Sequence, residues 1–164
     1  MTISPLADLP DAIRTLANWF YDEWHIFDGR SVEVIATQLS ENLNRDSIPI
    51  TFVAHRGSEL LGTISLDLSD LPSFDHLSPW LASLYVDAAF RGQGVGRGLV
   101  HHLQYFASLH RISPLYLWTF GSTRLYERCG WTQFASATYR CRSIKLMRFT
   151  NDYAASYEGS TGKG

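Results

Sequence analysis

The sequence predicts an α/β fold in which a mixed, mostly antiparallel sheet is flanked by helices. Three observations support this prediction. Apolar residues in the first 43 positions recur at the spacing of amphipathic helices. From Ile48 the pattern changes to short apolar runs separated by turn residues, which is typical of strands. A glycine-rich stretch between two such runs leads into another helical pattern, so strands and helices alternate in the second half of the chain.

Two helices are expected before the first strand. The first covers residues 8–25, with an apolar stripe formed by Ile13, Leu16, Ala17, Phe20 and Trp24. The Asp-Gly-Arg sequence at 28–30 interrupts this stripe. Ser31 is a candidate N-cap for the second helix, which continues to Leu43.

A β-hairpin and a central strand are expected next. Residues 50–55 and 60–68 are strand candidates, and the sequence Arg-Gly-Ser-Glu at 56–59 forms the turn between them. Residues 71–79 contain two prolines and are expected to form a loop. Residues 80–87 are apolar enough for a strand in the middle of a sheet.

The remaining elements continue the alternation. They are a helix at 94–110, a strand at 115–120, a short helix at 123–129 and strands at 131–134 and 143–149. Gly130 is expected to end the short helix. Residues 1–150 are therefore expected to form one domain, and residues 151–164, rich in Gly and Ser, a disordered tail.

The composition indicates a globular protein that binds neither nucleic acid nor a membrane. The formal net charge is −2, and the basic residues are dispersed rather than clustered as phosphate-backbone binding requires. One local group, Arg140, Arg142, Lys145 and Arg148, alternates along an expected strand and is interpreted as its solvated face. No part of the chain approaches the roughly 18 consecutive apolar residues of a membrane-spanning helix.

The cysteines suggest a reducing compartment. Cys129 and Cys141 are expected to be free thiols, because the N-terminus has no secretory signal and two cysteines in such a chain are seldom paired. We therefore expect a cytoplasmic protein. The spacing of His and Cys residues does not suggest a metal site.

The sequence Arg91-Gly92-Gln93-Gly94-Val95-Gly96-Arg97-Gly98 predicts an anion-binding loop. Glycines let the backbone approach a phosphate, and N–H groups at a helix N-terminus point towards it. Arg91 and Arg97 can add charge-assisted contacts. Two other phosphate motifs are excluded: the glycines are each two apart, unlike a dinucleotide fingerprint, and the Lys-Ser/Thr pair of a P-loop is absent.

Two motifs together resemble a known family. In the first, Val86 is followed after four residues by Arg91-x-x-Gly94-x-Gly96, which resembles the coenzyme A signature of the GCN5-related N-acetyltransferase (GNAT) superfamily. In the second, the sequence Leu-Tyr-Glu-Arg-Cys-Gly-Trp at 125–131 is similar to that family's Leu-Tyr-x-x-x-Gly-Phe element. The resemblance implies a GNAT-like sheet with a central splayed strand pair. It also implies direct acetyl transfer from acetyl-CoA to an amine in a ternary complex.

The resemblance also implies site residues. Coenzyme A would lie along the strand and loop formed by Ser83, Leu84, Tyr85, Val86, Arg91, Gly92, Gln93, Gly94, Val95, Gly96 and Arg97, with Thr119 opposite. A backbone N–H near Tyr85 or Val86 would polarise the thioester carbonyl. Tyr126 matches the family tyrosine whose hydroxyl protonates the departing thiolate, although packing beside Trp131 is an alternative role.

The general base and the acceptor stay open. A glutamate that some relatives use as a base is replaced here by Pro114. Other candidates are a water chain and the side chains of Tyr21, Asp22, Glu23, Asp67, Asp75 and His76. Trp19 and Tyr21 are candidates to line the acceptor pocket, whereas Phe20, Trp24 and Phe27 fit a core stripe.

The acceptor is expected to be a small-molecule or peptide amine, and relatives often form homodimers, which the sequence does not decide. No nucleophile for a covalent acyl-enzyme is evident, since Cys129 is interpreted as a small buried residue. The alternative function is a non-catalytic regulatory module that binds coenzyme A or an acyl-CoA.

Overall fold

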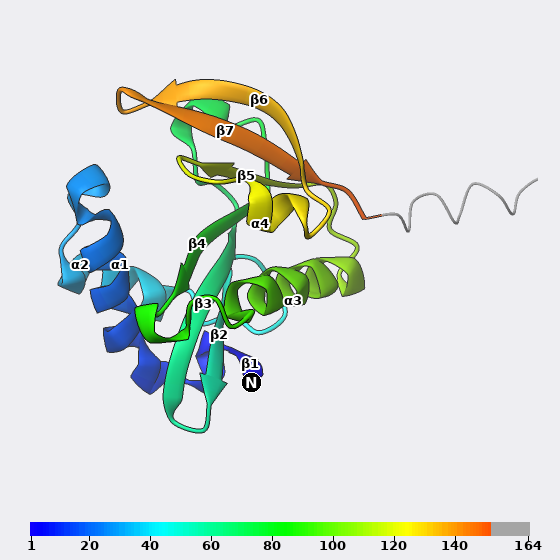
Figure 1. Ribbon diagram of the computed structural model, residues 1–164. Helices are drawn as coiled ribbons and strands as arrows, with labels where there is room; N and C mark the ends of the chain where they lie inside the picture. Colours follow the sequence, from blue (N-terminus) through cyan, green and yellow to red (C-terminus); the bar gives the residue numbers. More distant parts are fainter. Residues whose placement is uncertain (152–164) are drawn as a thin grey trace, which may run out of the picture.

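The computed structural model describes residues 1–151, and its core element is a mixed sheet (Figure 1). Seven strands lie in the order β1-β2-β3-β4-β5-β7-β6 within this part of the chain. Their bounds are Thr2–Pro5 (β1), Ile50–Arg56 (β2), Glu59–Asp67 (β3), Trp80–Val86 (β4), Leu115–Thr119 (β5), Thr132–Tyr139 (β6) and Arg142–Phe149 (β7). Among the strand pairs of residues 1–151, only β4–β5 is parallel. The predicted α/β class with a mostly antiparallel sheet is confirmed.

Helices cover both faces of the sheet. Helices α1 (Ile13–Asp28) and α2 (Val32–Glu41) lie on one side, and α3 (Val95–Leu109) lies on the other (Figure 1). The buried stripe of α1, which includes Leu16 and Phe20, packs with α2 against β2. The stripe of α3, which includes Leu99 and Leu103, packs against β2 to β5. A fourth, short helix, α4, spans Arg124–Glu127.

The predicted connection between α1 and α2 is confirmed in detail. Gly29 has a φ of 69° and ends α1 in the left-handed conformation that glycine adopts most easily. Ser31 is the N-cap of α2, and its Oγ accepts a hydrogen bond of 3.3 Å from the backbone N–H of Val34. The short connection between these two caps carries Arg30 to the edge of a cavity described below.

The central strand pair splays apart, as the resemblance implied. Strands β4 and β5 share one residue pair, Trp80 and Tyr116, at their first ends. Beyond it, β4 follows β3 while β5 pairs along its whole length with β7. A β-bulge adds to the divergence, because Ala82 and Tyr85 of β4 face residues of β3 that are only two positions apart. Figure 1 shows β5, β7 and β6 leaning away from β4.

Several predicted boundaries are wrong. Strand β1 was not expected, and the first helix begins at Ile13 because Pro10 starts a 3₁₀ turn before it. Strand β6 continues to Tyr139 rather than ending at residue 134, and it turns into β7 through Arg140 and Cys141, which have φ of 48° and 60°. Its inward side chains beyond Phe134 are mainly alanines, which give a weak apolar alternation.

The cysteines, the C-terminal tail and the character of the helices were also predicted from the sequence. Both cysteines are free thiols, Cys129 buried and Cys141 exposed, as predicted. The tail expected at 151–164 lies, beyond Asn151, outside the described residues. None of the helices in residues 1–151 has the length and apolar character needed to cross a membrane.

Candidate active site

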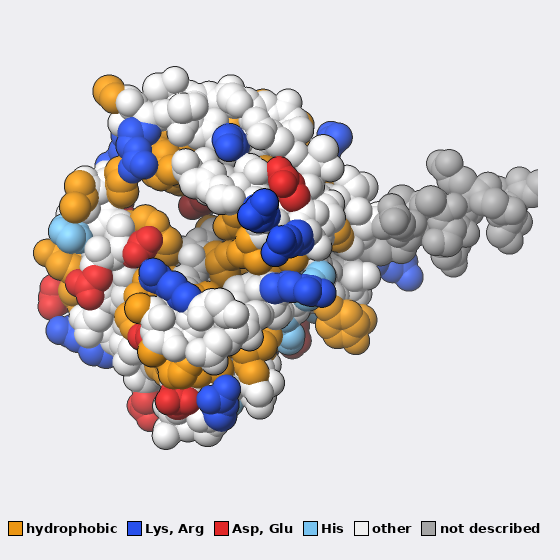
Figure 2. Space-filling view, viewed as in Figure 1, with side chains coloured by type: hydrophobic (Ala, Val, Ile, Leu, Met, Phe, Trp, Pro, Cys, Tyr) orange, Lys and Arg blue, Asp and Glu red, His pale blue; other side chains and the backbone are white. Residues whose placement is uncertain are grey.

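A cavity of about 640 Å³ opens where β4 and β5 separate. Its walls are formed by β4 and β5 with the turn that follows β5, by the last turns of α1, and by the β6–β7 hairpin. Figure 2 shows the surface hollowed between the α1–α2 pair and this hairpin. The cavity therefore joins the sheet gap to the side of the molecule that carries the N-terminal helices.

The bulge of β4 forms one wall of this cavity. Ser83, at the bulge, has a φ of 53°, which is uncommon for a residue with a side chain. Such strain is retained where surrounding structure imposes it, often at functional sites. Ser83 and Leu84 line the cavity, and Thr119 lines it from β5. The Thr119 Oγ1 accepts a hydrogen bond of 3.0 Å from the backbone N–H of Gly121, which fixes the end of that strand.

Tyr126 of α4 faces the same cavity. It packs with Trp131, and the two ring centres are 6.4 Å apart. Burial raises the pKa of the Tyr126 hydroxyl to about 12. The hydroxyl is therefore a neutral proton donor at physiological pH.

The glycine-rich loop lies between the end of β4 and α3. Gly92 and Gly94 have φ of 74° and 84°, which favour glycine. Gly98 donates 2.9 Å to the Gly94 carbonyl, and the earlier N–H groups of α3 have no intrahelical acceptor. Arg91 ties the loop to β4, since its Nε donates 2.9 Å to the Val86 carbonyl. A loop of free N–H groups with arginines fits a pyrophosphate.

The predicted cofactor residues form two groups. Ser83, Leu84 and Thr119 line the cavity together with Tyr126. The residues from Arg91 to Arg97 do not line it and instead surround the N-terminus of α3. Val86 packs in the core beneath α3. Tyr85 points to α1, where its ring stacks on Trp19 with 5.1 Å between centres.

The aromatic residues that line this cavity differ from those expected for an acceptor pocket. Trp19 is engaged with Tyr85, and Tyr21 stacks on His25 with ring centres 4.3 Å apart, so neither lines the cavity. Phe27, expected in the core, lines the cavity, and so does Trp24, which also packs against the core cluster as expected. At the end of the apolar stripe of α1, Phe27 packs on Phe120 and Arg142 rather than in the core.

The carboxyl groups also differ from the expectation. Of the base candidates, only Glu23 lines the main cavity. Asp67 lines a second cavity of about 320 Å³, which shares Arg30, Ser69 and Ser83 with the first. Burial, assisted by the charge of Asp70, raises the pKa of Asp67 to about 7. Asp70, which the sequence did not single out, lines the main cavity, and burial raises its pKa to about 6.

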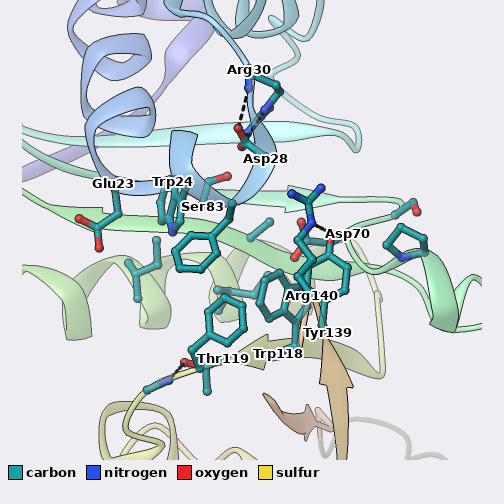
Figure 3. Close-up of a pocket in the computed structure, with 18 of the residues that line it drawn as sticks. Glu23, Trp24, Asp28, Arg30, Asp70, Ser83, Trp118, Thr119, Tyr139 and Arg140 are labelled. Carbon is teal, nitrogen blue, oxygen red and sulfur yellow. Dashed lines mark hydrogen bonds and ion pairs between the residues drawn. The ribbon is translucent and has the colours of Figure 1, made fainter. Parts of the chain in front are cut away.

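Asp28 forms an ion pair with Arg30. The Arg30 Nε and one terminal nitrogen donate to the same Asp28 oxygen at 2.9 and 2.7 Å (Figure 3). Burial favours a higher pKa for Asp28, but these bonds outweigh it and lower the pKa below its usual value. Asp28 is therefore an ion-pair partner rather than a proton acceptor.

The β6–β7 hairpin closes the outer side of the cavity through aromatic contacts. The guanidinium of Arg142 lies 4.1 Å from the ring centre of Phe120 and 4.9 Å from that of Phe27. These two rings stack with 5.1 Å between centres. Beside them, the Arg140 Nε donates 3.2 Å to the Tyr139 hydroxyl (Figure 3). The C-terminal hairpin is thus joined to α1 across the cavity.

Within residues 1–151, no group of three or more His, Cys, Asp or Glu side chains lies close enough together to hold a metal ion. The cavity is instead built from backbone edges, carboxyl groups, aromatic rings and a phenol.

Comparisons with solved structures show the same fold in N-acetyltransferases. An aminoglycoside 6′-N-acetyltransferase complexed with coenzyme A matches with a TM-score of 0.70 and 18% identity over 92% of this chain and 97% of that one. A spermidine N-acetyltransferase variant from Vibrio cholerae matches with a TM-score of 0.70 and 17% identity over 92% and 94%. A ribosomal-protein-alanine N-acetyltransferase from Brucella melitensis matches with a TM-score of 0.69 and 23% identity over 92% and 100%.

A comparison of the sequence with models of protein families assigns the chain to a family. No curated protein matches it significantly. The model of the acetyltransferase (GNAT) family matches residues 13–131, which include α1, the bulged strand, the glycine-rich loop and Tyr126. The chain therefore belongs to the GNAT family and is an acetyl-CoA-dependent N-acetyltransferase.

Proposed function

We propose that the chain transfers acetyl directly from acetyl-CoA to a small cationic amine, with both substrates bound together in the main cavity. The observation that carries the proposal is the shape of this cavity. One end is formed by the gap between β4 and β5, and the other by carboxyl and aromatic side chains of α1, Asp70 and the hairpin. Two substrates can thus meet at the bulge of β4.

The cofactor side of the proposal rests on the loop and the strand. Backbone N–H groups at the start of α3, with Arg91 and Arg97 nearby, would hold the pyrophosphate. The open edge of β4 at Ser83 to Val86 would pair with the pantetheine arm as an added strand does. A backbone N–H beside the bulge would then polarise the thioester carbonyl.

The chain's own proton donor on that side is Tyr126. Its raised pKa keeps the phenol protonated, as a general acid requires. We infer that its hydroxyl gives the proton to the departing sulfur. Bound acetyl-CoA supplies the activated acyl group, and no covalent acyl-enzyme is needed, because Cys129 does not line the cavity.

The acceptor side favours a cation. Glu23 and Asp70 supply negative charge, and the ring of Trp24 provides a face that attracts an ammonium group. Proteins of the same fold are named as aminoglycoside and spermidine N-acetyltransferases. Together these observations support a small polyamine or amino sugar. A peptide N-terminus, suggested by the name of the Brucella melitensis protein, is the second candidate.

The two free thiols support a cytoplasmic location. Cys129 and Cys141 are unpaired, which a reducing compartment maintains, so we place the reaction in the cytoplasm.

A turnover assay tests the proposal. The protein is incubated with acetyl-CoA and either spermidine, a 6′-amino aminoglycoside or a peptide with an N-terminal alanine, and released thiol is measured. We expect acetylation of one of the first two, with the product confirmed by mass spectrometry. If calorimetry shows acetyl-CoA binding while none of the amines is acetylated, a non-catalytic binding module is supported instead.

A further inference from the structure

We propose that Asp70, in the loop between β3 and β4, is the catalytic residue that takes the proton from the acceptor's ammonium group. The inference rests on the proposed function and adds a residue role to it. The sequence motifs of the family do not include this position, and a glutamate expected for the role is replaced by Pro114.

The sheet register brings Asp70 close to the reaction gap. In the parallel strands, the pair of Trp80 and Tyr116 places Ala82 level with Trp118, two residues further along each strand. Both residues line the main cavity, and so does Asp70. Asp70 lies close enough to the Trp118 indole for that N–H to lower its pKa slightly. The Asp70 carboxyl group is therefore next to the strand that faces the bulge at Ser83.

The loop itself is held in place by packing. Leu71, the next residue, is 1% exposed and packs in a cluster with Trp80 and Leu146. The Ser78 hydroxyl donates 2.8 Å to the Leu68 carbonyl, which closes the loop at its base. Asp70 is thus presented to the cavity from a fixed backbone. Figure 3 shows it on the same side as Trp118, Tyr139 and Arg140, opposite Glu23 and Trp24.

The charged and titratable groups around Asp70 leave it available for a substrate proton. Those in or beside the cavity are Glu23 and Asp28 of α1, Arg30, Asp67, Tyr126, Tyr139 and Arg140. Within residues 1–151 Asp70 has no ion-pair partner within 4.0 Å. The Trp118 Nε1 is buried and has no hydrogen-bond partner within 3.5 Å there, so its interaction with Asp70 is a long one.

Two other carboxyl groups near the cavity, Asp28 and Asp67, fit the role less well. Arg30 holds Asp28 and lowers its pKa. Asp67 lines the second cavity and not the main one. Burial raises the Asp70 pKa to about 6, against smaller opposing effects of Trp118 and Arg30. A carboxylate with that pKa is mostly ionised at pH 7 and is still more basic than an ordinary aspartate.

The proton balance is then complete. The acceptor arrives as an ammonium, which has no lone pair, and gives one proton to the Asp70 carboxylate. The lone pair forms the bond to the acetyl carbonyl carbon, the carbon–sulfur bond breaks, and its electron pair leaves on sulfur. The Tyr126 hydroxyl gives the sulfur a proton and is restored by the second proton that the nitrogen loses. Asp70 finally releases its proton to water.

The first test is kinetic and uses Asp70→Asn with Asp75→Asn as the matched control. Asp75 lies in the same loop, is exposed and lines neither cavity. With spermidine as the acceptor, we expect Asp70→Asn to lower kcat by about 10²- to 10³-fold, and Asp75→Asn to keep the parent rate. The parent kcat/KM for spermidine should rise with pH through about 6 and level off near 7, because the base of the free enzyme must lose its proton. Asp70→Asn should lack this rise, and Asp70→Glu should recover part of the rate.

The second test does not need turnover. Aspartate carboxyl carbons are labelled with ¹³C, and the Asp70 signal, assigned by its loss in Asp70→Asn, is titrated with and without spermidine. We expect a midpoint near 6 that falls when the cationic amine binds.

The outcomes separate the possibilities. A higher KM for the amine with unchanged kcat in Asp70→Asn would assign Asp70 to binding alone and overturn the proposal. An Asp70 titration midpoint in the ordinary range of aspartate that does not change when spermidine is added would also overturn the proposal. If the parent acetylates no amine, the proposed function fails, and the carboxyl titration still decides whether Asp70 meets the ammonium.

Discussion

Tyr126 gives the most direct test at the scale of single residues. Replacing it with Phe removes the hydroxyl and keeps the ring that packs on Trp131. We expect kcat to fall by about 10²-fold while the affinity for acetyl-CoA is unchanged, because general acid catalysis acts only in the transition state. Since the pKa is about 12, activity should not decline through tyrosine ionisation between pH 8 and 10.

Single-turnover measurement checks this prediction, with Tyr105→Phe as control. Tyr105 is 62% exposed on α3 and does not line the cavity. A Tyr126→Phe protein that runs at the parent rate would leave Tyr126 as a packing residue.

Asp67 provides a stability prediction. Its folded-state pKa of about 7 lies above that of an unfolded aspartate, so the folded protein holds the proton more strongly. This contribution to stability is present below pH 4 and is lost as the pH rises through 7. Asp67→Asn, which removes the charge, should therefore raise the free energy of unfolding by about 1–3 kcal/mol at pH 8.

Urea unfolding at pH 4 and pH 8 measures this difference. The exposed Asp46→Asn serves as the control. The gain should be present at pH 8 and absent at pH 4. Coincident unfolding curves for parent and Asp67→Asn at pH 8 would show that the charge is well solvated.

Which site residues the sequence could predict depends on how local their chemistry is. Tyr126 and the loop glycines belong to short motifs, so the family resemblance was enough to propose them as site residues. Asp70 becomes chemically distinct only when its loop folds against Trp118 on a strand far along the chain. Trp24 and Phe27 lie on an apolar stripe, and only the splay of the sheet leaves them facing a cavity.

At the scale of secondary-structure elements, a negative charge added at the start of α3 tests whether this helix end binds an anion. Gly94 has a φ of 84°, so any side chain there strains the backbone. Gly96 does not have a positive φ, so a side chain at that position causes no such strain. A Cβ at Gly96 would meet Val86 and Leu125 at 3.5 and 3.6 Å, which are ordinary contacts. Gly96→Asp should keep the fold, since acidic residues stabilise helix N-termini. It should weaken coenzyme A binding by at least about tenfold, or 1.4 kcal/mol.

Calorimetry with Gly96→Asn as control isolates the charge, because the two side chains have nearly the same size. The two variants should have similar melting temperatures and different affinities for coenzyme A. Equal affinities would mean that no anion binds at this helix end.

The hairpin of β6 and β7 is the second element to test. Arg142 lies over Phe120 and Phe27, and Arg148 lies 6.0 Å from the Phe134 ring centre near the other end of β7. Arg142→Ala should release the hairpin from α1 and raise the KM for the acceptor several-fold, without changing acetyl-CoA affinity. Each cation–π contact contributes about 0.5–1 kcal/mol at an exposed site.

Arg148→Ala is the control, since it loses a similar contact away from the cavity. Steady-state kinetics should separate the two variants by acceptor KM, while their melting temperatures fall by similar amounts. An unchanged acceptor KM in Arg142→Ala would limit the hairpin to a structural role.

The elements that the sequence missed are those with weak local patterns. Strand β1 has four residues, and β6 offers mainly alanines to the core beyond Phe134, so neither shows strong alternation. The helices and the β2–β3 hairpin were predicted because their apolar spacing, caps and turn residues agree.

At the scale of the whole molecule, the sheet order was beyond local patterns. Strand β7 inserts between β5 and β6, and β4 lies parallel to β5 with one shared pair. Both relations depend on contacts between distant segments. The splay was anticipated only through the family resemblance, and it creates the cavity on which the proposed function depends.

The single pair that joins β4 to β5 also has a consequence for motion. Backbone amides that face the gap lie at the centre of the molecule but lack a strand partner, so their hydrogens should exchange with solvent rapidly in the free protein. Bound coenzyme A would bridge the two parts of the sheet. Amide hydrogen exchange should then slow on β4 and β5 together. The concentration of coenzyme A would therefore control how far the two parts of the sheet move relative to each other.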